Sequence, residues 1–185
     1  MKPAHATYQQ RGTSMIEVLI TMVILAIGLL GLAGLQTRLQ VSEMEGYQRA
    51  QAMILLSDMS NRISANRSLA ASYVTGVATP LGSDMTCPSA NATLSDQDKR
   101  QWCMALQGAA EKSGASNVGT MIGGRGCVQA MPGNEYMITV AWQGLSGISA
   151  PPASVACGKN LYNGGACTGD LCRRVVTTLV RIAPL

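Results

Sequence analysis

Glu17 is the residue whose position most strongly indicates a chemical role, because it is a carboxylate at the N-terminal end of a long apolar run. The twenty residues from Val18 to Thr37 carry no charge, and eleven of them are Leu, Ile or Val. An acid at the centre of a membrane helix costs roughly 2.5 to 3.5 kcal/mol on insertion scales, and less near the interface. The aliphatic residues offset that cost, so the segment still inserts. An acid retained in such a run indicates a functional contact with a cation.

The six cysteines are the second group that could do chemistry, and all of them follow the apolar run. An even number of cysteines in an oxidising compartment indicates up to three disulfides, although six cysteines allow fifteen pairings and the sequence does not choose among them. Locally closable loops favour Cys87 with Cys103 and Cys167 with Cys172. Cys127 and Cys157 would then pair by elimination.

Catalysis and metal binding are disfavoured because His5 is the chain's one histidine. The chain after His5 therefore has no Ser-His pair, no Cys-His pair and no H-E-x-x-H site. A zinc site from Cys157, Cys167 and Cys172 is the alternative to disulfides, but no C-x-x-C spacing occurs. The Gly-rich stretch 123–126 lacks the phosphate-loop pattern, and a turn explains it. We expect no enzymatic activity, no cofactor and no metal.

The twelve residues ahead of the apolar helix form a polar leader with Lys2 and Arg11 that ends in Gly12. A secretory signal places its apolar region before the cleavage site, whereas here the apolar region follows the only plausible site. The helix would therefore stay in the mature protein. Basic residues ahead of it place the leader in the cytoplasm and the rest outside. The twelve Lys/Arg and nine Asp/Glu after Thr37 form too thin a basic excess for nucleic-acid binding.

Gly12, followed by Thr13-Ser14-Met15-Ile16-Glu17 and a long apolar helix, resembles the class III signal of type IV pilins and pseudopilins. The close resemblance covers about 35 residues, from the leader through the helix. It implies that a prepilin peptidase cuts between Gly12 and Thr13 and methylates the new amine of Thr13. It also implies that Glu17 pairs with the N-terminal amine of a neighbouring subunit. Thr13 stands where the family usually has Phe.

The resemblance implies a structural subunit, a minor pilin that takes part in type IV pilus assembly or priming. Its implied partners are prepilin peptidase, the inner membrane, and other minor and major pilins contacted through the N-terminal helix. The implied location is the inner membrane, single pass with the head in the periplasm, and an extracellular pilus after assembly. Cell adhesion and twitching motility are the associated roles. The alternatives are a minor pseudopilin of type II secretion and a membrane-anchored, disulfide-stabilised binding or adhesin module.

One long helix is expected to carry both the membrane segment and the start of the head. No proline occurs between Pro3 and Pro80. A helix from Thr13 to near Asn66 would be roughly 75 Å long at ~1.5 Å per residue. From Arg38 its apolar residues recur at spacings of mostly three or four, which is typical of an amphipathic helix. The core face predicted from them consists of Leu39, Tyr47, Ala50, Met53, Ile54, Leu56, Met59 and Ile63.

Gly28, Gly31 and Gly34 recur every three residues within the apolar segment. Each glycine costs roughly 0.8 to 1.0 kcal/mol of helix propensity in water, so the helix should loosen most easily here. Two compatible roles remain open. Small residues permit close packing against another helix in lipid, and the segment could extend locally when a subunit leaves the bilayer for a filament.

After the long helix, the sequence predicts a small head. Residues 68–95 have loop composition, and a second helix is expected from an N-cap at Ser95 to a stop at Gly114. Strands are expected at 126–130, 135–143 and 173–182, with a hairpin turn at 132–134. In the second strand, Tyr136, Ile138, Val140 and Trp142 alternate with smaller or more polar neighbours, which is typical of a half-buried antiparallel strand. Residues 145–169 form a long loop in which cysteines supply order.

The predicted fold class is α+β and pilin-like. A long N-terminal helix, half in the membrane and half amphipathic, packs on a small antiparallel β-sheet head with disulfides. The expected organisation is a class III leader peptide at 1–12, a transmembrane and assembly helix at 13–37, and a periplasmic head at 38–185 that includes the second half of the long helix.

Overall fold

A computed structural model describes residues 14–109, 112–114, 116–117, 121–165 and 167–183 of the chain. Helix α1 (Met15–Ala65) is 51 residues long, which confirms the expected single helix over the described part. The structure divides into two units between Ser42 and Glu43.

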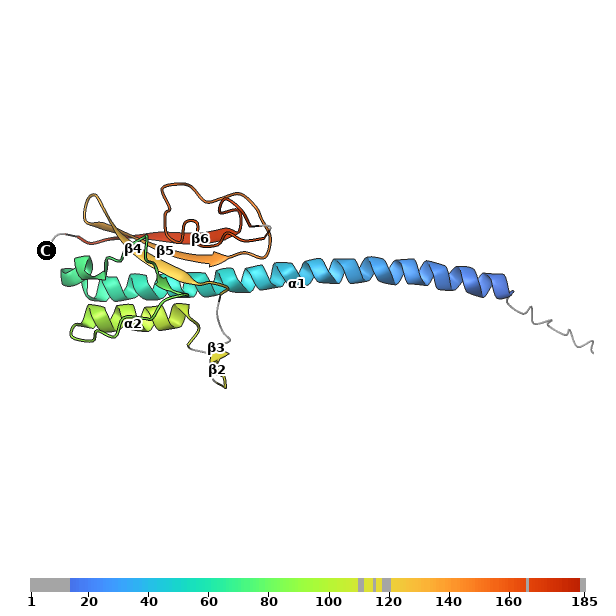
Figure 1. Ribbon diagram of the computed structural model, residues 1–185, viewed down its shortest axis with the longest axis horizontal. Helices are drawn as coiled ribbons and strands as arrows, with labels where there is room; N and C mark the ends of the chain where they lie inside the picture. The colour runs from blue at the N-terminus through green and yellow to red at the C-terminus, as the bar shows by residue number, and fades with distance from the viewer. Residues whose placement is uncertain (1–13, 110–111, 115, 118–120, 166, 184–185) are drawn as a thin grey trace, which may run out of the picture. The chain divides into compact units, whose positions relative to one another are not determined.

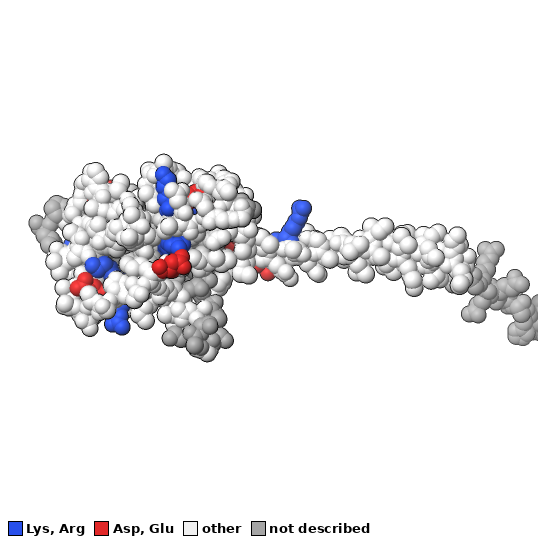
Figure 2. All heavy atoms as spheres, in the orientation of Figure 1, with Lys and Arg blue, Asp and Glu red and all other residues white. Residues whose placement is uncertain are grey.

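The first unit is the N-terminal part of α1. Every described residue from 14 to 42 is exposed, and α1 is long and apolar enough to cross a membrane. The hydroxyls of Thr21 and Thr37 donate to the carbonyls of Val18 and Ala33, at 2.8 and 3.1 Å. These polar groups are therefore satisfied within the helix, as a lipid environment requires. Figure 2 shows a blue side chain on the helix and only white atoms from there to the grey N-terminal residues, on the face in view.

The second unit combines the rest of α1 with a four-stranded antiparallel sheet in the order β1-β4-β5-β6 (Figure 1). A separate two-stranded sheet pairs β2 with β3. The elements after α1 are a 3-10 helix η1 (Arg67–Tyr73), β1 (Leu81–Gly82), α2 (Leu94–Leu106), β2 (Lys112–Ser113), β3 (Ser116–Asn117), β4 (Arg125–Met131), β5 (Glu135–Gln143) and β6 (Arg173–Arg181).

The three main strands and the hairpin between β4 and β5 confirm the sequence prediction within a residue at each end. The hairpin turn needs positive φ at Gly133 (+80°) and Asn134 (+59°), residue types that tolerate this conformation. The prediction of a plain loop over 68–95 was wrong, because η1 extends into it as far as Tyr73 and β1 lies within it.

The bounds predicted for the second helix were also wrong. Helix α2 has its N-cap at Thr93, whose hydroxyl accepts from the Asp96 amide at 3.2 Å, and it ends at Leu106 rather than Gly114. The same hydroxyl donates to the Asp96 carboxylate at 2.8 Å, which lowers the pKa of Asp96. Ser95, the predicted cap, lies inside the first turn because Thr93 occupies the position that caps it.

The predicted core face of α1 was only partly right. Leu56, Met59 and Ile63 are buried, and the two other buried residues are Ala52 and Gln48. The remaining predicted members are exposed, namely Leu39, Tyr47, Ala50, Met53 and Ile54. At 100° per residue the buried set falls on one side of the helix, whereas Tyr47, Ala50 and Ile54 fall on the opposite side. Both sides carry apolar residues, so spacing alone did not separate them.

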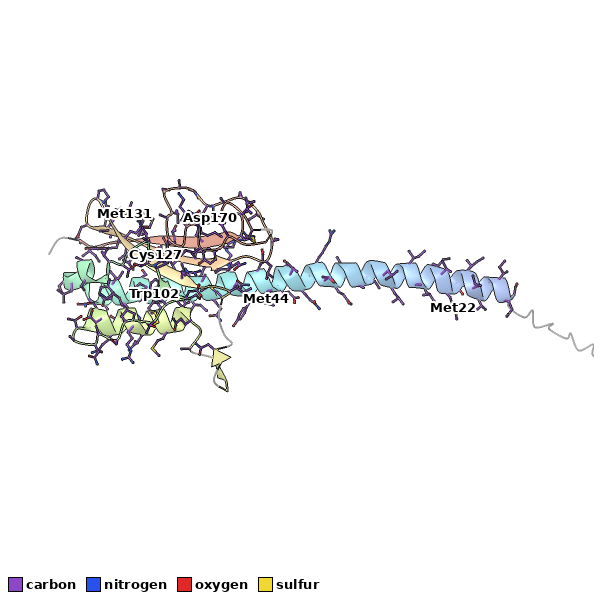
Figure 3. The ribbon with its side chains drawn as sticks, in the orientation of Figure 1. Met22, Met44, Trp102, Cys127, Met131 and Asp170 are labelled. Atoms are coloured by element: carbon purple, nitrogen blue, oxygen red, sulfur yellow. A yellow bond between two sulfur atoms is a disulfide. The ribbon has the colours of Figure 1, made fainter. Side chains whose placement is uncertain are left out.

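The core lies between the sheet and the two helices. On β5, Tyr136, Ile138, Val140 and Trp142 are all buried, as predicted. The expectation of a half-buried strand was wrong at its centre, where Thr139 and Ala141 are also buried. Trp102 of α2 is fully buried, and its indole N–H donates to the Leu55 carbonyl of α1 at 2.9 Å. Figure 3 labels Trp102 beside α1, and Figure 1 shows both helices on one side of the sheet.

A buried polar cluster around Asp98 joins α1, η1 and α2. Arg62 donates to Asp98 at 2.7 Å, and the hydroxyl of Tyr73 donates to the other carboxylate oxygen at 2.5 Å. Burial and the Asp98 hydrogen bond raise the pKa of Tyr73 to about 12. These bonds satisfy the carboxylate that α2 brings into the core, and they hold α2 against both α1 and η1.

Gly126 of β4 lies where the sheet meets Trp102, so Gly126→Ala is expected to destabilise the head. A methyl group there would overlap the indole ring and come within 2.8 Å of Leu106. Overpacking of this kind costs about 1 to 3 kcal/mol. Chemical unfolding followed by tryptophan fluorescence measures it. Gly164→Ala is the matched control, because nothing lies within 4 Å of its added methyl, and equal midpoints for the two variants would contradict the close contact.

The segment 145–172, called the cysteine loop below, covers part of the other face of the sheet (Figure 1). The disulfides are Cys87–Cys103, Cys127–Cys157 and Cys167–Cys172. Local loop closure favoured the first and the third, and elimination left the second. Cys127 lies on β4, so its bond to Cys157 ties the middle of the cysteine loop to the sheet.

Candidate processing and assembly site

Glu17 lies in the first turn of α1. The carbonyl of Ser14 accepts from the amides of Glu17 and Val18, at 2.9 and 3.3 Å, so the helix is hydrogen-bonded from Ser14 onward. Free N–H groups at a helix start carry partial positive charge, which stabilises a carboxylate in the first turn. The local fold therefore tolerates Glu17 but supplies only a weak counter-charge.

The side chain of Glu17 is exposed and makes no ion pair with any residue that the structure describes. In lipid, an exposed carboxylate on an apolar helix strongly favours a cationic partner. Gly12 and Thr13, the predicted cleavage and methylation residues, lie outside the described residues. The structure thus places Glu17 on an apolar helix surface.

Gly28, Gly31 and Gly34 lie in continuous helix, and nothing comes within 4 Å of a methyl group added at any of them. Packing among the described residues therefore does not require glycine at these positions. A role for them involves either another helix or a change in the helix itself.

The six cysteines do not form the alternative zinc site, because all of them are joined in disulfides. Their sulfurs therefore serve the head's structure.

Two buried arginines were missed as structural anchors of the cysteine loop. Arg173 donates to the carbonyls of Val155 and Cys157 at 2.7 and 3.1 Å, and pairs with Asp170 at 3.2 Å. Arg125 pairs with Asp84 and stacks on the ring of Tyr162. Their sequence signal was weak, since Arg173 is one half of an Arg-Arg pair and Arg125 follows two glycines.

Tyr162 connects the cysteine loop to the turn before β4. Its hydroxyl donates to the Gly123 carbonyl at 2.9 Å, and burial raises the pKa of this residue to about 12. The turn at Gly123 has φ +62°, and Arg125 after it is already paired. The Gly-rich stretch therefore works as a turn that positions an ion pair.

Residues 8–33 match the protein family described as "Prokaryotic N-terminal methylation motif". The matched stretch contains Gly12, Thr13 and Glu17 and runs into the apolar part of α1. Together with the long apolar helix and the α+β head, it supports a type IV pilin-like protein that prepilin peptidase processes. No curated protein and no solved structure matches the chain.

Proposed function

We propose that this protein is a minor pilin of a type IV pilus. The observation that carries the proposal is the methylation motif at residues 8–33, which runs directly into the apolar part of a 51-residue helix. In this proposal the chain is cut between Gly12 and Thr13 and methylated on Thr13. In its sequence, the N-terminal helix resembles that of the minor pilin PilV.

Glu17 is the assembly contact in the proposed mechanism. Before assembly, the helix holds the subunit in the inner membrane with its head in the periplasm. In a growing fibre or a priming complex, the carboxylate pairs with the N-terminal amine of an adjacent pilin at the same depth. Such a pair forms in a low-dielectric bundle, where an unpaired carboxylate is strongly disfavoured.

The proposed partners are prepilin peptidase, the inner membrane, and other minor and major pilins. Gly28, Gly31 and Gly34 either permit close approach of a neighbouring helix or let the segment extend on leaving the bilayer. A surface fibre that contains this subunit would account for the proposed roles in adhesion and twitching motility.

A minor pseudopilin of type II secretion uses the same N-terminal chemistry, so it remains the second candidate. Sheared surface fibres distinguish the two, because a minor pilin is recovered in pili. A membrane-anchored binding module is the third candidate. Mass spectrometry of the N-terminal peptide separates it from both: a pilin begins at a methylated Thr13, whereas an ordinary anchored protein keeps the leader.

Gly12→Val is expected to abolish most leader removal, because the family's peptidase site admits little side chain beside the cut. Gly12→Ala should be intermediate. The measurement is the ratio of full-length to shortened chain in membranes that contain prepilin peptidase. Gly28→Ala is the matched control, since its added methyl meets nothing within 4 Å and lies away from the cut. Complete processing of Gly12→Val would overturn the class III assignment.

A further inference from the structure

Strand β6 lies at one edge of the four-stranded sheet. The bonds Ile182 N–H to Asn134 O (3.1 Å) and Gly144 N–H to Cys172 O (2.8 Å) continue the β5–β6 register beyond both ends of the pairing. Even-numbered positions therefore face β5 with their backbone groups. Because these groups alternate along an antiparallel strand, the odd-numbered positions direct their N–H and C=O groups away from the sheet.

Along most of β6, these outward-directed N–H and C=O groups have no backbone partner among the described residues. The Arg173 amide donates to the Asp170 carbonyl at 3.0 Å, which closes the start of the edge. From Val175 to Arg181, the described part of the chain supplies no backbone partner on that side. Thr177 and Leu179 are exposed, the latter at 59%.

The usual means of protecting a sheet edge are largely missing from β6. Protected edges are short, bulged, or interrupted by proline or inward-pointing charge. Strand β6 has nine residues in unbroken register with β5, and its sequence RRVVTTLVR contains no proline. A long regular edge of this kind is a template for an additional strand.

A pocket of about 370 Å³ lies beside the beginning of this edge. It is lined by Glu45, Gly46 and Arg49 of α1, Arg174, Val175 and Val176 of β6, Trp142 of β5, and Ile148 of the cysteine loop. Tryptophan, valine and isoleucine give it apolar walls. A methyl group added at Gly46 would meet nothing within 4 Å, so the helix leaves room on its side of the pocket.

The pocket rim favours an acidic group. Arg174 is held by the carbonyls of Leu171 and Ser146, at 3.0 and 2.7 Å, and lies 3.5 Å from Glu45. Arg49 is exposed and makes no ion pair with any described residue. One carboxylate therefore faces two guanidinium groups, which leaves an excess positive charge at the rim.

We propose that the free edge of β6 binds an extended strand from a different protein chain. The incoming strand pairs with the outward backbone groups at Val175, Thr177 and Leu179. One of its apolar side chains enters the pocket, and a carboxylate two residues along, on the same face of the incoming strand, meets Arg49. Main-chain bonds supply affinity in this mode, and the pocket supplies selectivity. The proposal concerns the head alone and does not depend on the fibre role of Glu17.

Charge argues against a second copy of β6 as the occupant. Two β6 strands paired antiparallel about Thr177 would bring Arg173 of each copy opposite Arg181 of the other. Like charges directly opposite each other destabilise a strand pair. A neutral strand with acidic ends avoids this conflict and matches the basic ends of β6.

The test measures binding of synthetic peptides to the full-length chain in detergent micelles. The probe is a fluorescent nine-residue peptide with glutamate at both ends and threonine and valine alternating between them, starting and ending with threonine, so that valine and glutamate share one face. A second peptide has lysine at both ends, and a third carries N-methyl groups on alternate backbone amides. The glutamate peptide should bind roughly tenfold or more tightly than either of the others, which corresponds to at least about 1.4 kcal/mol. It should also slow amide hydrogen exchange in residues 173–181.

Two variants localise the binding. Thr177→Pro removes an outward N–H while leaving the bonds to β5, so it should weaken binding roughly tenfold, whereas Thr177→Val should not. Arg49→Glu should weaken the glutamate peptide and strengthen the lysine peptide. Equal binding of the N-methylated peptide, undetectable binding of all peptides, or self-association through β6 in sedimentation would each overturn the proposal. The peptide comparison holds even if the proline variant fails to fold.

Discussion

A chain carrying Glu17→Ala is expected to enter the inner membrane at the wild-type level or slightly above it, and to be missing from sheared surface fibres. Insertion should not suffer, because the acid is the costliest group in the apolar run. Assembly should suffer, because the amine of the neighbouring subunit would be buried without its counter-charge. The measurement compares the amount of this chain in membrane and fibre fractions.

The expected size of the assembly defect follows from the energetics of buried ion pairs. Removing one member of such a pair typically costs about 3 to 5 kcal/mol, which is a factor of hundreds or more in an assembly constant. Glu17→Leu should behave like Glu17→Ala. Glu17→Asp should be intermediate, since it keeps the charge but shortens the reach by one methylene group.

Glu43→Ala is the matched control, because Glu43 is another exposed acid of α1 and has no ion pair within the described chain. It lies beyond the apolar run, so its loss should leave fibre incorporation intact. If Glu17→Ala reached fibres as well as Glu43→Ala does, the carboxylate would not be the assembly contact. The assignment would then rest on leader processing alone.

The features that sequence predicts well here are those with a strong local signal. The apolar run and the lack of proline predicted one continuous helix. The alternation from Tyr136 to Trp142 predicted both β5 and its buried face. Glu17 could also be selected from sequence, because an acid in an apolar run conflicts with its surroundings. The structure adds that it lies exposed in the first turn.

The features that sequence missed depend on contacts between distant residues. Strand β1 has only two residues, and its pairing with β4 defines it. The buried side of α1 contains Gln48, while apolar Ile54 is 61% exposed. Which side of an amphipathic helix is buried depends on the sheet and on α2, whose positions no local pattern encodes. Arg125 and Arg173 likewise anchor the cysteine loop through contacts with residues distant from them in the sequence.

Replacing Cys127 and Cys157 together by alanine is expected to destabilise the head more than removing either other disulfide. In the chain-entropy model the contribution grows with the length of the closed loop. The sequence separations are 30 for this pair, 16 for Cys87–Cys103 and 5 for Cys167–Cys172. The corresponding contributions are roughly 3.5, 3 and 2 kcal/mol. These are large fractions of a domain's typical ~5 to 15 kcal/mol. Membrane insertion should be unchanged, because it depends on the apolar run.

The cysteine loop should nevertheless keep its place in the Cys127/Cys157 double variant under native conditions. Arg173 holds the carbonyls of Val155 and Cys157, and Tyr162 bonds to Gly123, so several anchors remain after the disulfide is gone. We therefore expect a lower unfolding midpoint by tryptophan fluorescence, together with near wild-type hydrogen-exchange protection in residues 155–162. The Cys167/Cys172 double alanine variant is the control and should lose the least stability. A loop that became fully exchangeable in the Cys127/Cys157 variant would show that the disulfide, and not the buried arginine, holds this segment against the sheet.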